Sequence, residues 1–323
     1  MRNQLPIFAL LLLLLGLGAC EEEYTPEDVF DEPQLVVEGY VEYGPGALPP
    51  YVILTQSSPY IGDLSPDRLA ELFVHDADVR VSDGENEVQL TEFCLGDLAA
   101  LDTAVAQTVA EFLGLGGISV TELEYCIYID IFGFLNFSPL EIEPGRSYSL
   151  LVRAGEDSVS AVTTLAPLVG FDSLYYVDHP DYPENDSLVE LRASVTDPAG
   201  EENYYRVFTK RNEEPFYPLL GQSVTDDKIF DGRSGFEIPV QRGQSFVSEF
   251  DLETAGYYWR GDTAVVRVSN IDYPHFRFWQ TFEYSSGSQG PFGNYVRIES
   301  NIQGGLGVWG GLHYEDYELI IPR

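Results

Sequence analysis

Positive charge is the scarcest property of this 323-residue sequence. Lys and Arg together number 17 against 53 Asp and Glu, and lysine occurs only at Lys210 and Lys228, so the formal net charge is −36. A chain of this charge repels the phosphate backbone of nucleic acids and anionic lipid surfaces, which excludes nucleic acid as a partner. The carboxylates are spread along the chain, which indicates a solvated acidic surface. We favour a high-salt habitat as the explanation, ahead of a cation-binding surface and the attraction of cationic ligands.

Thiols and imidazoles are also few, with three cysteines and four histidines. Cys94 and Cys126 each lie in a strand-like context, and they either form a disulfide or remain two buried free thiols. A disulfide would close a loop of about thirty residues, which the chain-entropy model values at roughly 3 to 4 kcal/mol. No histidine stands in a recognisable pattern with a cysteine, so the sequence predicts no nucleophilic cysteine, no metal site and no cofactor.

A long apolar run occurs at the N-terminus. Arg2 precedes an apolar segment over 7–15, and this order is typical of a secretory signal peptide. The next residues, Leu17-Gly18-Ala19-Cys20, resemble the lipobox of bacterial lipoproteins, which implies cleavage before Cys20 and acyl chains such as palmitate on that cysteine. Residues 1–19 are therefore the expected signal peptide. Residues 20–33 are an acidic linker whose run Glu21–Glu23 resembles the signal that directs Bacteroidetes lipoproteins to the cell surface.

The composition predicts a mainly β protein. Aromatic residues make up 13% of the chain, with 21 Tyr and 30 Gly, and apolar residues alternate with polar ones in short segments separated by turn residues. We expect two β-sandwich-like domains, 34–168 and 169–323, of which the first is immunoglobulin- or transthyretin-like. The predicted strands are 34–42, 51–56, 77–82, 87–93, 124–132, 147–153, 158–164, 189–195, 203–210, 234–240, 245–252, 263–269 and 317–321.

Two segments have the period of a helix instead. Over 97–113 the apolar residues recur at intervals of three and four, with Asp97 as the N-cap and Gly114 at the end. This inserted helix either caps the open end of a sandwich, which we favour, or forms a lid over a ligand. A second helix is expected after Asp272, with Pro274 in its first turn. Its aromatic residues belong to the core or, as the less favoured alternative, form a stacking platform for a ligand.

Two groups of acidic residues are candidate metal or catalytic sites. The acidic loop 178–186 lacks the alternating ligand spacing of a Ca²⁺ site, so a solvated loop is the favoured interpretation. Asp226, Asp227 and Asp231 can be an acid and base pair or cation ligands, but Asp followed by Gly is ordinary turn chemistry, which we favour.

The C-terminal segment carries the most distinctive motif, in which glycines indicate positive φ angles or closely packed backbones. We predict a tight crossing there, next to the last strand. Together with Leu35–Val41, Tyr204–Val207 and Gly290–Phe292, the motif resembles the DUF4249 lipoproteins of Bacteroidetes. Those proteins commonly have Phe where this chain has Trp309. The motif residues are Ser300, Asn301, Ile302, Gly304, Gly305, Leu306, Gly307, Val308 and Trp309.

This resemblance implies a surface-exposed lipoprotein held in the outer-membrane lipid through Cys20, and it supplies no catalytic residues. Genes of this family often lie beside those of TonB-dependent receptors, which implies a non-enzymatic binding or accessory role in nutrient uptake. The alternatives are a hydrolase acting on glycans or peptides and a structural or adhesion protein of the envelope.

Overall fold

The computed structural model describes residues 33–58, 66–101, 125–135, 137–179, 187–245, 251, 253–287 and 297–323. Within the chain, Gln34–Arg323 forms one compact unit. The predicted signal peptide, Cys20 and nearly all of the acidic linker lie outside the described residues.

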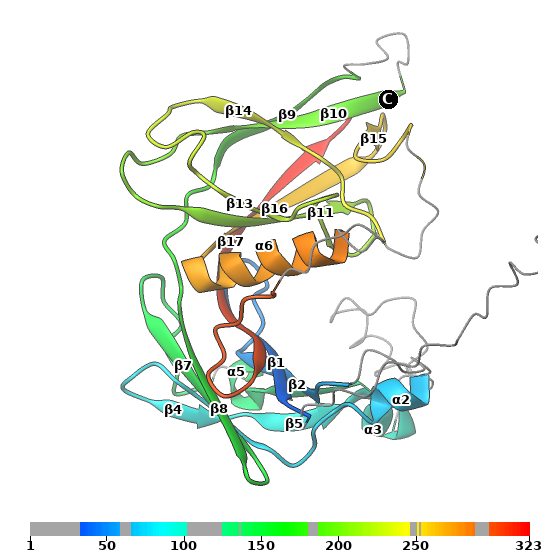
Figure 1. The fold of residues 1–323 in the computed structure, drawn as a ribbon. Coiled ribbons are helices and arrows are strands. Elements are labelled where there is room, and N and C mark those ends of the chain that lie inside the picture. Colours follow the sequence, from blue (N-terminus) through cyan, green and yellow to red (C-terminus); the bar gives the residue numbers. More distant parts are fainter. Residues whose placement is uncertain are drawn as a thin grey trace, which may run out of the picture. The chain divides into compact units, whose positions relative to one another are not determined.

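The prediction of a mainly β protein is confirmed: the described residues form three sheets and a few helices (Figure 1). The largest sheet has nine strands in the order β12-β11-β16-β17-β1-β2-β6-β5, and β13 pairs beside β12 with the outer edge of β11. Its strands are β1 (Leu35–Tyr43), β2 (Tyr51–Gln56), β5 (Thr91–Cys94), β6 (Cys126–Ile129), β11 (Tyr204–Arg211), β12 (Tyr217–Pro218), β13 (Val224–Asp226), β16 (Thr263–Ile271) and β17 (Leu306–Ile320).

Two four-stranded sheets complete the β structure. The first comprises β4 (Glu87–Gln89), β3 (Asp78–Ser82), β7 (Ser147–Ala154) and β8 (Asp157–Thr164) in that spatial order. The second places β10 (Leu188–Val195) between β14 (Phe236–Val240) and β9 (Phe171–Asp178), with the short strand β15 (Tyr258–Trp259) at one end of β10.

Side-chain alternation gives the nine-stranded sheet two different faces. On β1, Val37 and Val41 are fully buried in a hydrophobic core, and on β11 Val207 enters a second core. Residues at the alternate positions, such as Glu38 on β1 and Phe208 on β11, line a pocket on the opposite face. Because successive strand residues point to opposite sides, one face carries the two large cores, and the other carries the pocket together with a smaller hydrophobic cluster that includes Tyr40 and Leu312.

The two large hydrophobic cores lie on different parts of the nine-stranded sheet. The first contains buried residues between Leu35 and Leu165 together with Ile302 and Trp309, and the second contains residues between Val189 and Val268 together with Ile321. Each four-stranded sheet packs on its own part of the nine-stranded sheet, which produces the sandwich-like packing. The two predicted regions nevertheless share this central sheet, so their independent folding stays a prediction.

Strand β17 joins the two regions. Its first half pairs in parallel with β1, from Leu306 opposite Val36 onward, and its second half pairs antiparallel with β16 as far as Ile320 opposite Thr263. The sequence predicted only 317–321 as a strand. The sequence interpreted the motif glycines as a crossing near that strand, but Gly307, Gly310 and Gly311 are part of β17 itself. At Gly307 the backbone of β1 leaves no room for a Cβ, and at Gly310 the His275 ring does the same.

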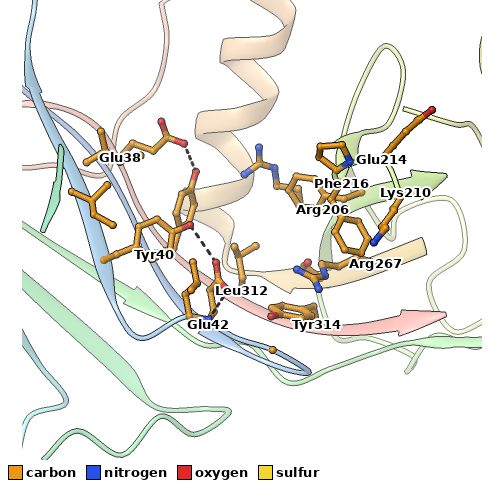
Figure 2. Close-up of a pocket in the computed structure, with 18 of the residues that line it drawn as sticks. Glu38, Tyr40, Glu42, Arg206, Lys210, Glu214, Phe216, Arg267, Leu312 and Tyr314 are labelled. Carbon is orange, nitrogen blue, oxygen red and sulfur yellow. Dashed lines mark hydrogen bonds between the residues drawn. The ribbon is translucent and has the colours of Figure 1, made fainter. Parts of the chain in front are cut away.

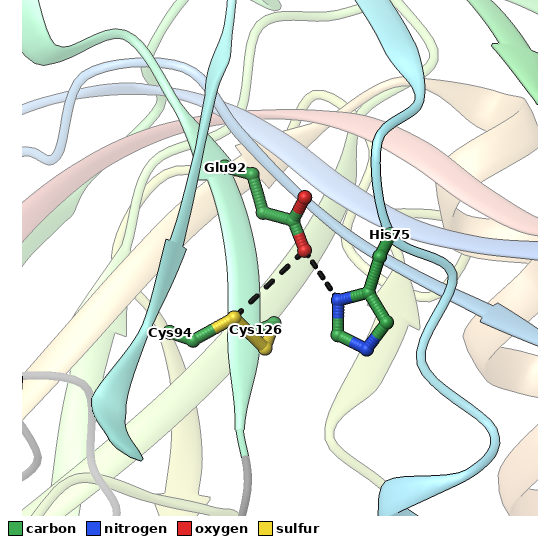
Figure 3. A group of neighbouring side chains, drawn as sticks. All are labelled: His75, Glu92, Cys94 and Cys126. Atoms are coloured by element: carbon green, nitrogen blue, oxygen red, sulfur yellow. Dashed lines mark hydrogen bonds and ion pairs between the residues drawn. A yellow bond between two sulfur atoms is a disulfide. The ribbon is translucent and has the colours of Figure 1, made fainter. Parts of the chain in front are cut away.

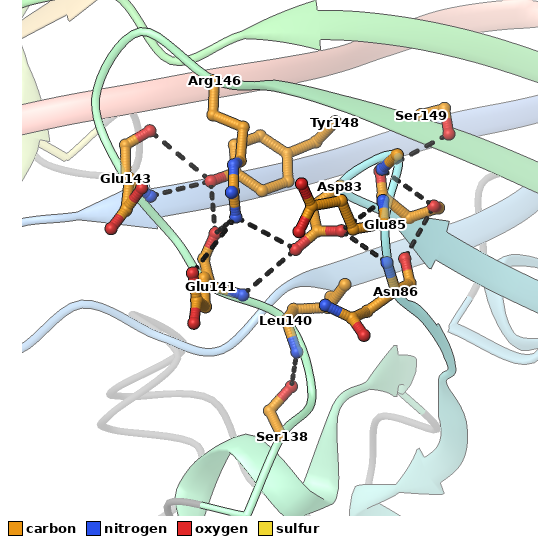
Figure 4. Close-up of polar contacts among 12 residues, drawn as sticks. Asp83, Glu85, Asn86, Ser138, Leu140, Glu141, Glu143, Arg146, Tyr148 and Ser149 are labelled. Atoms are coloured by element: carbon orange, nitrogen blue, oxygen red, sulfur yellow. Dashed lines mark hydrogen bonds and ion pairs between the residues drawn. The ribbon is translucent and has the colours of Figure 1, made fainter.

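The hairpin predicted at Asp83-Gly84 is confirmed. Ser82 pairs with Glu87, and the Asp83 carboxylate accepts hydrogen bonds from the backbone N–H groups of Glu85, Asn86 and Glu141 (Figure 4). Burial raises the pKa of Asp83, but these donors and the Arg146 guanidinium lower it by more than burial raises it. The net pKa therefore lies below its usual value. The turn is thus tied to the segment before β7 by a buried charge.

The helices are short except for α6 (Tyr273–Gly287), which the sequence predicted after Asp272. The Asp272 carboxylate accepts from the backbone N–H of His275, as an N-cap does. The remaining helices are α2 (Pro66–Ala70), α3 (Leu95–Leu101) and α5 (Ile131–Phe134). Only the start of the predicted helix 97–113 falls within α3; the rest lies outside the described residues. Within the described part of the chain, no helix has both the length and the apolar character needed to cross a bilayer.

Other differences from the predicted elements are local. Strand β9 occupies 171–178, which were left without a strand, and the predicted strand 124–132 ends in α5 because the Asp130 carboxylate caps that helix turn at Gly133. The predicted strand 245–252 lies mostly outside the described residues.

Candidate functional site

A pocket of about 570 Å³ lies on the face of the nine-stranded sheet opposite the two cores. Residues two apart on β1 and on β11 supply its charged walls, since such residues project from the same side of a strand. Figure 2 shows the acidic wall of Glu38 and Glu42 on one side and the basic groups Lys210 and Arg267 on the other. The volume falls in the range of small-molecule sites, about 300 to 1,000 Å³.

Arg206 is the central cation of the pocket, and its side chain is fixed by aromatic rings. The residue is only 7% exposed. Its guanidinium carbon lies 3.5 Å from the ring centre of Trp279 on α6 and 4.7 Å from that of Phe208 on β11. Two stacked rings orient a guanidinium plane and leave its N–H edge for a polar partner. The Nε of Arg206 is buried without a hydrogen-bond partner.

The other cations of the pocket differ in how they are neutralised. Arg267 donates two hydrogen bonds to the Asp316 carboxylate, at 2.7 and 2.9 Å. Burial lowers the pKa of Arg267, but this pairing outweighs burial and raises it overall. By contrast, among the described residues no carboxylate forms an ion pair with Arg206 or Lys210. In the described part of the chain, Arg206 and Lys210 are therefore pocket cations without a carboxylate counter-charge, which a ligand can supply.

The acidic wall is held in place by tyrosines. The Tyr40 hydroxyl donates to Glu38 Oε1 at 3.0 Å, and the Tyr51 hydroxyl donates to Glu42 Oε1 at 3.3 Å. Burial raises the pKa of Glu42, although the backbone N–H of Leu48 opposes the shift. Burial and the charge of Glu38 also hold the pKa of Tyr40 well above its usual value. Both hydroxyls are thus neutral donors across the physiological pH range.

His275 lies beneath the pocket, with its ring centre 5.7 Å from that of Tyr40. Its Nδ1 is 3.2 Å from the Gly311 carbonyl oxygen, and its Nε2 is buried with no partner. Burial and, to a smaller extent, the charge of Arg206 lower the pKa of His275 to about 3. The imidazole is therefore neutral, and it supports the ring of Tyr40 without adding charge to the site.

We expect His275 to make the stability of the protein depend on pH. Between its unfolded pKa near 6.5 and its folded pKa of about 3, the unfolded chain binds a proton that the folded chain does not bind. Stability should therefore fall as the pH drops from 6.5 to 3, by up to about 1.4 kcal/mol per pH unit from this group. Urea unfolding of the wild type and of His275→Gln at pH 4, 5, 6 and 7 measures this slope.

The His275→Gln variant should lack the part of the stability-versus-pH slope that His275 causes. It should keep the contribution of Asp272, which has the opposite sign. Burial raises the folded pKa of Asp272, so its contribution to stability is lost as the pH rises above the usual carboxyl range. Equal slopes in both proteins would show that His275 titrates normally in the folded state.

The predicted cysteine pair lies away from the pocket. Cys94 and Cys126 stand opposite each other on β5 and β6 and form a disulfide, with Cα atoms 4.1 Å apart (Figure 3). His75 and Glu92 lie beside them, and the four groups are close enough to surround a metal ion. Because both sulfurs are bonded to each other, only the imidazole and one carboxylate remain as ligands, too few for a closed zinc site.

The C-terminal motif residues hold the sheet together. The side-chain amide of Asn301 donates to the Trp309 carbonyl at 2.7 Å and accepts from its N–H at 3.0 Å, so Asn301 takes the place of a strand partner. Ser300 Oγ donates to the Gly307 carbonyl in the same way. Ile302 is buried in the first core, whereas Leu306 is partly exposed. The motif is therefore a structural element of the strand that forms the pocket floor.

The remaining candidates have mainly structural contacts. Asp227 and Asp231 accept backbone N–H groups of Asn203 and Gly200, which agrees with turn chemistry. Of the aromatic residues on α6, Trp279 packs against the small core below the helix, whereas Tyr284 is 62% exposed. Of the acidic loop 178–186, only Asp178 and His179 are described, and Asp178 pairs with Arg260.

Sequence reasoning missed the pocket. A signal was present in the alternation of charged and aromatic residues along Glu38–Glu42 and along Arg206–Lys210, two segments that the sequence predicted only as strands. Finding the site requires knowing that these two strands belong to one sheet, in which β16 and β17 lie between them.

The fold and the site define a β-sandwich-like protein that carries a ligand-sized pocket on its central sheet. The chain belongs to the family described as domain of unknown function DUF4249, whose family model matches residues 21–318. The family predicted by the resemblance is thus confirmed. No curated protein and no solved structure matches the chain.

Proposed function

We propose that this protein is a non-enzymatic lipoprotein that binds a small ligand at the cell surface and works with a TonB-dependent transporter in nutrient uptake. The observation that carries the proposal is the pocket, because no carboxylate among the described residues pairs with its cations Arg206 and Lys210, although the chain is strongly acidic. A buried guanidinium with no counter-charge is costly for a fold, and this cost is accounted for when a ligand supplies the counter-charge.

The anchor is proposed from the sequence. Leu17-Gly18-Ala19-Cys20 has the order of small residues before a cysteine that lipoprotein processing requires, and two or more acyl chains on Cys20 are enough for stable membrane attachment. The acidic residues after Cys20 and the resemblance to Bacteroidetes lipoproteins support the outer face of the outer membrane as the location.

The test is a pull-down of the full-length protein from its native outer membrane in mild detergent, followed by mass spectrometry. We expect one β-barrel transporter at stoichiometric yield, and we expect Cys20→Ala to abolish membrane attachment. Recovery of lipid alone from well-solubilised membranes would contradict the transporter role, and membrane attachment of Cys20→Ala would contradict the anchor.

One observation favours a second candidate, a hydrolase acting on glycans or peptides. Glu42 lies in the pocket with a raised pKa, as a general acid needs, and Glu38 precedes it by four residues on the same strand. Turnover of a glycan or peptide that is lost in Glu42→Gln, with binding retained, would replace the non-enzymatic proposal.

A further inference from the structure

We propose that the pocket recognises a zwitterion, an amino acid or a short peptide, by pairing its carboxylate with Arg206 and its ammonium group with Glu38 or Glu42. This inference rests on the proposed ligand-binding function and names the class of ligand.

The carboxylate position follows from Arg206. Stacking between Trp279 and Phe208 fixes the plane of the guanidinium, and the residue is 7% exposed with no ion-pair partner in the described part of the chain. A carboxylate is the planar anion that matches this fork with two parallel hydrogen bonds. Because the rings already hold the guanidinium, pairing requires little further ordering of the side chain.

The ammonium position follows from Tyr40. Its hydroxyl donates to Glu38 and also lies close enough to Arg206 to feel its charge, so an acidic and a basic group flank one tyrosine (Figure 2). The ammonium and carboxylate groups of an amino acid are attached to the same carbon, which suits two protein groups that flank one side chain. Glu42 lies four residues beyond Glu38 on β1, roughly 13 Å away along the strand. The amine of a short peptide, which is farther from its carboxylate, can reach this second position.

Net charge separates a zwitterion from a simple anion. A chain of formal charge −36 repels a net anion as it approaches, and this repulsion opposes the attraction of the two unpaired cations. A zwitterion presents a carboxylate to Arg206 without a net charge, and its ammonium group gains from the acidic wall. The arrangement of opposite charges on the two walls therefore suits a neutral ligand with separated charges.

The rest of the pocket suits an apolar or aromatic side chain. Rings of Tyr51, Tyr125, Phe208 and Phe216 contribute to its walls, and Ile53 and Leu312 add aliphatic surface. Flat rings favour a flat apolar group through offset or edge contacts. Phenylalanine and the tripeptide Ala-Phe-Ala are therefore the appropriate probes.

The test is isothermal titration of the full-length protein in mild detergent with each probe and with its C-terminal amide and N-acetyl forms. We expect at least one free zwitterion to bind with a Kd below 1 mM (a free energy of about −4 kcal/mol). Each blocked form should bind at least about tenfold more weakly, since it leaves one charged group of the pocket unpaired. Absence of binding by both probes, or equal binding of free and blocked forms, would overturn the proposal.

Variants then assign each charge. In Arg206→Gln the free acid and the amide should bind alike, whereas Arg233→Gln, an exposed arginine outside the pocket, should behave as the wild type. Loss of discrimination between free and N-acetylated probes in Glu38→Gln indicates an amino acid, and the same loss in Glu42→Gln indicates a peptide. The assignment would be overturned if folded Arg206→Gln, Glu38→Gln and Glu42→Gln all still bound the free probes more tightly than the blocked ones.

Circular dichroism establishes that each variant is folded. If Arg206→Gln does not fold, the comparison of free and blocked probes on the wild type still decides the proposal. Because these titrations contain no transporter, zwitterion binding without a co-purified barrel would overturn the transporter role and keep the ligand class. A co-purified barrel with no zwitterion binding would overturn the ligand class and keep the transporter role.

Discussion

Replacing Trp309 with alanine is expected to lower the free energy of unfolding by about 3 to 5 kcal/mol, the range for large buried aromatic residues. Trp309 is fully buried in the first core. Its indole N–H donates to the Tyr148 carbonyl at 2.9 Å, which links the nine-stranded sheet to β7. The substitution removes the ring, leaves a cavity between the two sheets and leaves a buried acceptor without its donor. Urea unfolding followed by far-UV circular dichroism measures the loss.

Two further variants separate these contributions. Trp309→Phe keeps a ring in the core and loses the N–H, so we expect a smaller loss of about 1 to 3 kcal/mol. Tyr284→Ala removes an aromatic side chain that is 62% exposed on α6 and should change stability by no more than about 0.5 kcal/mol. A loss for Trp309→Ala no larger than that for Tyr284→Ala would show that the tryptophan does not hold the two sheets together.

Gly307→Ala is expected to prevent folding or to destabilise the protein by more than about 3 kcal/mol, because strain and overlap act together. Gly307 has a φ of 106°, and a Cβ at this position would lie 1.8 Å from the Val37 carbonyl oxygen on β1. The neighbouring atom belongs to a paired backbone and cannot rotate away. Relief of the overlap would require β1 and β17 to separate at their first paired residues. Soluble yield and the midpoint of thermal unfolding report the effect.

The matched control for this substitution is Gly84→Ala. Gly84 has a φ of 92°, but a Cβ there would meet no atom within 4 Å. This variant therefore carries only the cost of an unfavourable backbone angle, of order 1 to 3 kcal/mol. The additional loss in Gly307→Ala measures the steric overlap with β1. Equal destabilisation of the two variants would contradict the close approach of β1 to β17 at Gly307.

Local patterns were enough to predict the elements whose partners are near in the sequence. The strand 51–56 was predicted with the bounds of β2, and Asp83-Gly84 identified the turn between β3 and β4, because alternation and turn chemistry are properties of a few neighbouring residues. The N-cap Asp272 was found for the same reason. Family membership followed from the C-terminal motif, which the matched range includes.

Contacts between distant segments could not be predicted in this way. Gly307 and Gly310 disfavour a strand when only propensity is considered, yet both lie in β17, where the Val37 carbonyl and the His275 ring exclude any side chain. The pocket escaped prediction for a related reason. Glu38 and Arg206 have opposite charges on strands that are not neighbours in the sheet, and only the order β11-β16-β17-β1 places them on one surface.

The parallel pairing of β1 with β17 also determines when this protein can fold. Val36 near one end of the chain pairs with Leu306 near the other, so the central sheet cannot close until the ribosome has made almost all of the polypeptide. Contacts between such distant residues slow folding, because a very large loop has to be ordered first. For an exported protein, as proposed above, this delay keeps the chain unfolded and able to pass through a membrane channel before its core forms.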